Sequence, residues 1–281
     1  MTSATTEKNK WLRITETIID EILVVRIQSM WRGVMYRKNN LPNSILRIQQ
    51  ILRSVQFECS EKTIDGRINS SFDEYLILDI LQKYLGDRID VPQKRWWYDV
   101  SIYDYMYGWL PVNIKSSTLQ TADNTGNMVM CVYAITDYPI DLDTNYNSGH
   151  MSDVLFDKFI KKQFNRQYKR DYYFVAINKN NTNEVLVNSV KGLTILTSNI
   201  NNLPYQIRWN LNKKFEYCDI VNVKDKLVFA LSSPKRSWKE SLLENMRNIN
   251  RPRVKKSKPQ FIILRRSSRI QSNKVLCKLR Y

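Results

Sequence analysis

The chain has 281 residues and 43% hydrophobic content, enough for one large domain with a core. Lysine and arginine total 44 against 27 aspartate and glutamate, and the resulting charge of +17 favours a polyanionic partner such as nucleic acid, although an AT-rich coding bias also produces basic chains. A single histidine, four cysteines without a CxxC pair and the absence of a membrane-spanning apolar run argue against two-histidine metalloproteases, zinc modules and membrane proteins. We therefore expect a soluble protein inside a cell.

Residues 11–38 carry apolar side chains at helical spacing, which predicts one long amphipathic helix. The run IQSMWRGVMYR at residues 27–37 resembles the IQ motif, IQxxxRGxxxR, which binds calmodulin and related EF-hand proteins. The residues at the fixed positions are Ile27, Gln28, Arg32, Gly33 and Arg37. The resemblance implies an apolar helix face that lies in the groove of an acidic partner. The alternative is a helix that packs on its own domain.

Two shorter helices are predicted next. After a break at residues 39–43, Ser44 is expected to cap a helix that ends near Ser54. A second helix is expected from about Ser71 to Tyr84, with Glu74 in its first turn. Acids at this position are commonly solvated and favoured by the helix dipole, so Glu74 is only a candidate for a site.

Residues 96–117 predict a β-hairpin with its turn at Tyr107 and Gly108, which sets Asp99 opposite Lys115. Side chains alternate along a strand, so Asn113 and Lys115 share a face, and Asp99 joins them as a cross-strand neighbour. A carboxylate, an amide oxygen and an ammonium then meet at one point. This combination suits a divalent metal beside a phosphate, while the alternative is a hairpin with a solvated acid and a solvated lysine.

The pattern of Asp99, Asn113 and Lys115 resembles the PD-(D/E)XK nuclease superfamily, which includes the type II restriction endonucleases, over the middle of the chain. The resemblance implies hydrolysis of phosphodiester bonds in double-stranded DNA with Mg²⁺ or Mn²⁺. It assigns the metal to Asp99, the Asn113 side chain and the Ile114 carbonyl. Lys115 is then expected to orient water and the scissile phosphate.

The same resemblance implies that Glu74, on the helix before the hairpin, assists the metal or water at a distance. Two positions depart from the family pattern. Tyr98 stands where the family often has proline, and Asn113 stands where it usually has Asp or Glu. The amide at position 113 removes one negative charge, so we expect weaker metal affinity.

The elements after the hairpin are less sharply marked. Residues 121–127 predict a polar loop in which Asp123 is either a further carboxylate or a cap for an apolar helix at 128–135. A helix with a basic end is expected at 151–168, followed by strands at 172–178 and 184–189 that extend the central sheet. By analogy with restriction enzymes, the late segments face DNA, and the candidate contacts are Lys191, Gln206 and Arg208.

We expect an α/β fold with a central mixed β-sheet of about four to six strands flanked by helices and preceded by N-terminal helices. The predicted units are an N-terminal extension (1–55), a nuclease-like domain (56–250, with its last helix at 234–250) and a basic tail (251–281) with eleven Lys and Arg and no acid. The expected function is site-specific, metal-dependent DNA cleavage, as a monomer or homodimer. The alternatives are a nuclease fold that binds DNA without cleaving it and a calmodulin-binding interaction protein. Calmodulin is eukaryotic, so an IQ helix implies the nucleus or cytoplasm of a eukaryotic host, with a virus-encoded origin compatible with the composition.

Overall fold

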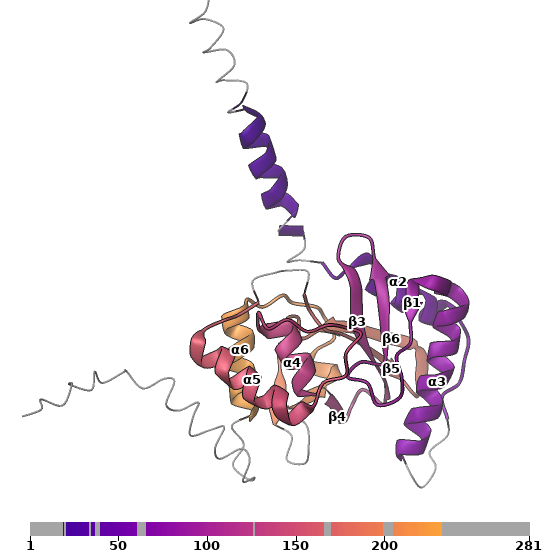
Figure 1. Ribbon diagram of the computed structural model, residues 1–281. Helices are drawn as coiled ribbons and strands as arrows, with labels where there is room; N and C mark the ends of the chain where they lie inside the picture. The colour runs from indigo at the N-terminus through magenta and orange to yellow at the C-terminus, as the bar shows by residue number, and fades with distance from the viewer. Residues whose placement is uncertain are drawn as a thin grey trace, which may run out of the picture.

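The computed structural model describes residues 19, 21–33, 35–36, 40–60, 66–125, 127–165, 170–198 and 205–231. These residues form an α/β fold around a mixed five-stranded sheet with the order β1-β2-β3-β5-β6 (Figure 1). Strands β3 and β5 run parallel, and the other neighbours are antiparallel. This arrangement confirms the predicted fold class. The strands of this sheet are β1 (Ile89–Asp90), β2 (Val100–Asp104), β3 (Gly108–Ser117), β5 (Tyr173–Asn178) and β6 (Asn181–Ser189).

Helices α2 (Asn43–Ser54) and α3 (Gly66–Leu85) cover one face of this sheet, and a short 3-10 turn, η1 (Gly86–Arg88), follows α3. The side chains of Gln49 and Arg53 on α2 both donate to the Val185 carbonyl of β6, at 2.7 and 2.8 Å. Helix α2 is therefore part of the α/β body, which corrects the expected boundary at residue 56. Helix α2 begins without a side-chain cap, so Ser44 does not have the capping role expected of it.

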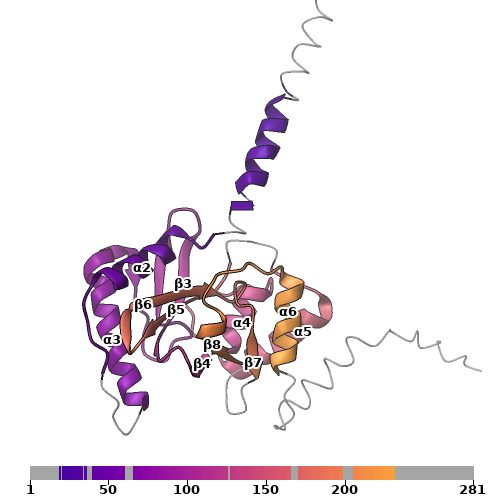
Figure 2. The same cartoon turned by 180° about the vertical axis from the view of Figure 1, so that it is seen from behind.

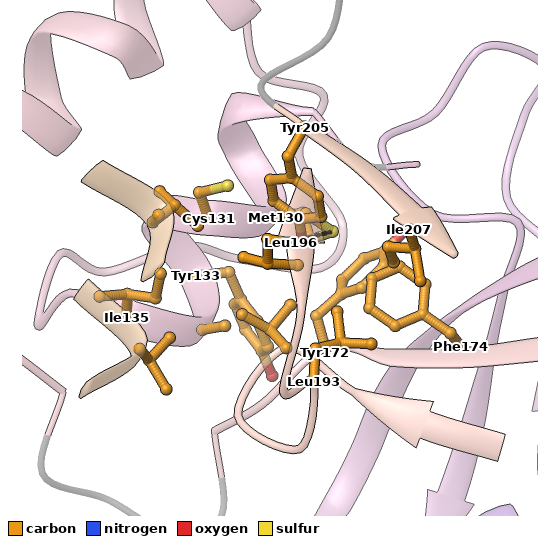
Figure 3. Close-up of a cluster of buried hydrophobic side chains, with 14 of the residues drawn as sticks. Met130, Cys131, Tyr133, Ile135, Tyr172, Phe174, Leu193, Leu196, Tyr205 and Ile207 are labelled. Carbon is orange, nitrogen blue, oxygen red and sulfur yellow. Dashed lines mark hydrogen bonds between the residues drawn. The ribbon is translucent and has the colours of Figure 1, made fainter. Parts of the chain in front are cut away.

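The other face is covered by α4 (Met128–Ile135), α5 (Ser148–Lys161) and α6 (Ile220–Leu231), together with a small sheet of order β4-β8-β7 (Figure 2). Its strands are β4 (Ala122–Thr125), β7 (Leu196–Ser198) and β8 (Tyr205–Arg208), and the 3-10 turn η2 (Trp209–Leu211) follows β8. Figure 3 shows Met130 and Cys131 of α4 gathered with Leu196, Tyr205 and Ile207 of the small sheet. Every residue of α4 is buried, because the helix lies between other elements.

Strand β5 is buried on both faces, which explains its unbroken apolar sequence. Tyr173, Val175 and Ile177 enter the core beneath α2 and α3. Phe174 and Ala176 enter the opposite core, where Figure 3 shows Phe174 beside Tyr172. The predicted pair of strands at 172–178 and 184–189 therefore extends the central sheet as expected.

Two predictions along the chain need correction, and one helix was missed. Helix α5 ends at Lys161 instead of continuing to residue 168, and Lys162 adopts a left-handed conformation with φ of 55° that closes the helix. Residues 122–125 form a strand, where a polar loop was expected. Helix α6 was not predicted at all. The helix expected at 234–250 and the tail at 251–281 lie outside the described residues.

The β2–β3 hairpin turns at residues 105–107, so its midpoint lies at Met106, one residue before the predicted midpoint at Tyr107. The Asp104 carboxylate holds this turn, because its Oδ1 accepts hydrogen bonds from the backbone N–H groups of Met106 and Tyr107, at 2.9 and 3.2 Å. Gly108 then takes a positive φ of 75°, a conformation that glycine adopts without strain. The ladder pairs Val100 with Val112, so the expected pairing of Asp99 with Lys115 is wrong.

Candidate functional site

Asp99 immediately precedes β2 and binds the edge of β3. Its backbone N–H donates to the Val112 carbonyl at 3.0 Å, and its Oδ2 accepts the Ile114 N–H at 2.7 Å. Strand β3 continues past the first residue of β2, so the Asp99 side chain satisfies a backbone donor that the ladder leaves without a strand partner. The carboxylate is thereby fixed beside Asn113 although the register differs from the predicted one.

Asn113 and Lys115 share the face of β3 that also carries their β5 neighbours Phe174 and Ala176. The predicted common face is therefore present, because a shift of two residues leaves the alternation unchanged. Asn113 Oδ1 is buried and accepts no hydrogen bond from any described residue. A buried carbonyl oxygen without a donor costs about 1–3 kcal/mol, so this atom is suited to a ligand that supplies positive charge.

Tyr172 lies near the Asn113 side chain. Its hydroxyl donates to the Trp97 carbonyl at 3.0 Å and is also within hydrogen-bonding reach of the Asn113 side chain. Burial raises the pKa of Tyr172 well above its ordinary value, with the Asp99 charge adding to the rise. Tyr172 therefore stays neutral beside the Asn113 side chain.

Glu74 reaches the same site from α3. Burial raises its pKa to about 7, the nearby Asp99 charge adds to the rise, and Lys115 opposes it. Asp99 itself has a raised pKa, because burial outweighs the effects of Lys115 and the Ile114 N–H. Two carboxylates from different elements therefore repel each other across a partly desolvated space, which is an arrangement that a bound cation relieves.

Asp123 is a further carboxylate at the site. It lies on β4, and its Oδ2 accepts the Trp209 indole N–H at 2.7 Å. Burial raises its pKa, while hydrogen bonds from Ser117 and Trp209 and the charge of Lys115 oppose the rise. It does not cap α4, because the side chain of Asn127 does so by accepting the Met130 N–H at 2.8 Å. The pairing of β4 with β8 brings Asp123 to the site, in agreement with the expected alternative of a further carboxylate.

Lys115 lies near these three acids, but no ion pair is found between its ammonium and any of them among the described residues. Its charge acts on the pKa of Asp99, Glu74 and Asp123. None of the ion pairs within 4 Å among the described residues includes Lys115. The ammonium is therefore available to an additional anionic group.

A divalent cation fits this donor set. Asp99 supplies a carboxylate and Asn113 an oxygen without a donor, and the Ile114 carbonyl points to the same edge of β3 as its N–H, because both groups of a strand residue face the same neighbour. No cluster of three or more His, Cys, Asp or Glu side chains suited to a metal occurs within the described residues. The candidate metal ligands are therefore a mixed set of oxygens of the kind that Mg²⁺ accepts when water and phosphate complete its shell.

The expected DNA contacts divide into two groups. Lys191 is 2% exposed, and its Nζ donates to the Arg170 carbonyl at 2.7 Å. Burial lowers the pKa of this ammonium, while Asp171 opposes the change. Lys191 is thus an internal structural residue, and the prediction that it contacts DNA is wrong. Gln206 and Arg208 lie on the outer face of β8, where Arg208 is exposed and Gln206 Nε2 donates to Asn124 Oδ1 at 2.9 Å.

The N-terminal helix at residues 21–33 points away from the α/β body (Figure 1). Ile27, Met30 and Trp31 are 63%, 71% and 64% exposed, and Gln28 and Arg32 are exposed as well. Gly33 is half-buried, and Arg37 lies outside the described residues. The described part of the helix therefore does not pack on its own domain, which was the alternative interpretation.

No protein-family model matches the chain, and no curated protein matches it. Within the described residues, none of the helices combines the length and the apolar character that crossing a membrane requires.

Proposed function

We propose that the protein is a metal-dependent DNA endonuclease of the restriction type. The observation that carries the proposal is that Asp99, Glu74 and Lys115 lie close enough for their charges to act on the carboxylates, beside the strand that carries the unpartnered amide oxygen of Asn113. Acid and amide oxygens beside a free ammonium suit a cation and a phosphate together. The net charge of +17 supports a polyanionic substrate.

Each residue has a definite task in this proposal. Asp99, Asn113 Oδ1 and the Ile114 carbonyl hold Mg²⁺ or Mn²⁺. A bound cation of this kind stabilises charge on the scissile phosphate and lowers the pKa of coordinated water. Lys115 holds the phosphate and orients the attacking water, and Glu74, with its pKa near 7, accepts a proton close to neutral pH. The expected products carry a 5′-phosphate and a 3′-hydroxyl.

The test is incubation of mixed duplex DNA and supercoiled plasmid with the protein and Mg²⁺ or Mn²⁺, followed by sequencing of the new ends. Defined ends that disappear with a chelator and with Asp99→Ala support site-specific cleavage. Full activity of Asp99→Ala refutes the assignment. Binding without cleavage in either metal supports the alternative of a nuclease fold that only binds DNA.

We also propose that the N-terminal helix binds an EF-hand protein of the calmodulin type, because its apolar side chains are exposed and accompanied by arginine. The test is co-purification of the full chain with calmodulin, with and without Ca²⁺. Ile27→Asp should abolish binding, while Ile19→Asp, at a 51% exposed position outside the motif, should not. Equal binding by both variants contradicts the proposal.

A further inference from the structure

A polar cavity of about 650 Å³ opens between residues 56–59, which follow α2, and residues 179–183 at the β5–β6 turn. This volume lies within the range of roughly 300–1,000 Å³ common for ligand sites. It is separate from the carboxylate site, and none of the functions proposed above uses it.

The cavity adjoins the carboxylate site through one ion pair. Lys179, in its wall, places Nζ 2.9 Å from Asp73 Oδ2, and the same oxygen accepts the Ser116 hydroxyl at 2.6 Å. Asp73 precedes Glu74 on α3, and Ser116 follows Lys115 on β3. The cavity therefore lies next to residues that adjoin the carboxylate site in the sequence.

The walls of the cavity are held in place by hydrogen bonds. Asn178 Oδ1 accepts the Asn180 N–H at 3.0 Å, and Asn181 Oδ1 accepts the Asn183 N–H at 3.2 Å. The Thr182 hydroxyl donates to the Phe57 carbonyl at 2.9 Å, which ties the turn to the opposite wall. The turn is thus organised before any ligand arrives.

The remaining polar groups of the cavity are neutral amides. Gln56, Asn180 and Asn183 are exposed, and their carboxamides form no hydrogen bond with any described residue. The charged residues in the lining are Glu58 and Lys179, and the Lys179 ammonium is already paired with Asp73. A phosphate would meet an acid and no unpaired cation here. A base edge, in contrast, offers donors and acceptors that carboxamides match in pairs.

We propose that this cavity reads the edge of a DNA base next to the cleavage point and so contributes to sequence specificity. The inference rests on the proposed function, since it needs DNA at the carboxylate site. It assigns Asn180 and Asn183, with Gln56 opposite, to base recognition.

The test is selection of bound sequences from random duplex DNA, which does not require cleavage. All arms carry Lys115→Ala. One arm adds Asn180→Ala and Asn183→Ala together, a second adds Asn180→Ala alone, and a control adds Gln50→Ala, an exposed carboxamide on α2 outside the cavity. Thermal melting checks that each protein is folded.

The cavity variants should lose about tenfold or more in discrimination at one or two base positions, with unchanged salt dependence, while the control keeps the parent motif. An unchanged motif in the cavity variants overturns this inference alone. Uniform weakening with a smaller salt slope also overturns it, because it indicates a phosphate contact. A parent protein that selects no DNA refutes the proposed function itself.

Discussion

The Asp99 carboxylate accepts a hydrogen bond from the Ile114 backbone N–H, at 2.7 Å. This contact joins the residue before β2 to the strand that carries Asn113 and Lys115. It leaves the other carboxylate oxygen of Asp99 outside this bond, in a place where burial raises the pKa of the group. Burial therefore makes the ionised form of Asp99 costly unless a cation lies beside it.

Asp99→Asn separates these two roles. The amide oxygen can still accept the Ile114 N–H, and the burial cost of a charge is removed, so the free energy of unfolding should not fall. Cleavage should drop by at least about 10²-fold, because the metal loses its charged ligand. Urea unfolding and plasmid cleavage measure the two effects, and a variant that is both unstable and fully active contradicts this account of Asp99.

Asn113→Asp restores the acid that the nuclease family usually has. We expect cleavage to be kept or increased and Mg²⁺ affinity to rise. Without metal, the buried additional charge should lower stability by about 1–3 kcal/mol, so Mg²⁺ should raise the melting temperature more than it does for the parent chain. Asn113→Leu is the matched control and should lose the metal effect. An Asp variant that folds but does not cleave would mean that Asn113 serves a purpose other than coordination.

Asp73 should stabilise the fold in a pH-dependent way. Burial acts to raise its pKa, but hydrogen bonds from Ser116, Lys179 and Ser60 outweigh burial and hold the pKa below the ordinary value of 3.8. The stabilisation is therefore complete above the ordinary pKa of 3.8, and it is lost as the pH falls through the lower pKa of the folded state.

Asp73→Asn should accordingly cost about 3 kcal/mol at pH 7, as for a broken buried ion pair, and less in acid. Asp79→Asn, at an exposed position on the same helix, should have little effect at either pH. Urea denaturation of both variants at several pH values is the measurement. A cost for Asp73→Asn that is equal at pH 7 and pH 3 would contradict the linkage.

The sequence was informative where local alternation decides the structure. Asn113 and Lys115 share a face because they are two residues apart on a strand, and that relation survived the error in the hairpin register. The register itself depended on the Asp104 side chain, which draws the turn to residues 105–107 and is not visible in the pattern of apolar residues. Strand alternation is therefore a safer guide to a site than an assumed turn.

The open and the wrong predictions concern residues whose environment comes from distant parts of the chain. Asp123 was expected either as a further carboxylate or as a cap, and the pairing of β4 with β8, more than 80 residues later in the sequence, decides for the carboxylate. Lys191 was assigned to DNA by analogy with restriction enzymes, yet its ammonium lies inside the fold, where it donates to the Arg170 carbonyl and interacts with the charge of Asp171. Neither long-range relationship leaves a local signature.

The most direct test of the central claim compares DNA cleavage and DNA binding by Lys115→Ala with the same measurements on the parent chain, in Mg²⁺ and Mn²⁺. Lys83→Ala, which removes an exposed lysine from the last turn of α3, controls for loss of a positive charge. We predict that Lys115→Ala binds DNA within about threefold of the parent while cleaving it at least about 10²-fold more slowly, and that Lys83→Ala behaves like the parent. Cleavage by Lys115→Ala at the parent rate, or a parent chain that cuts no DNA in either metal, would contradict the account.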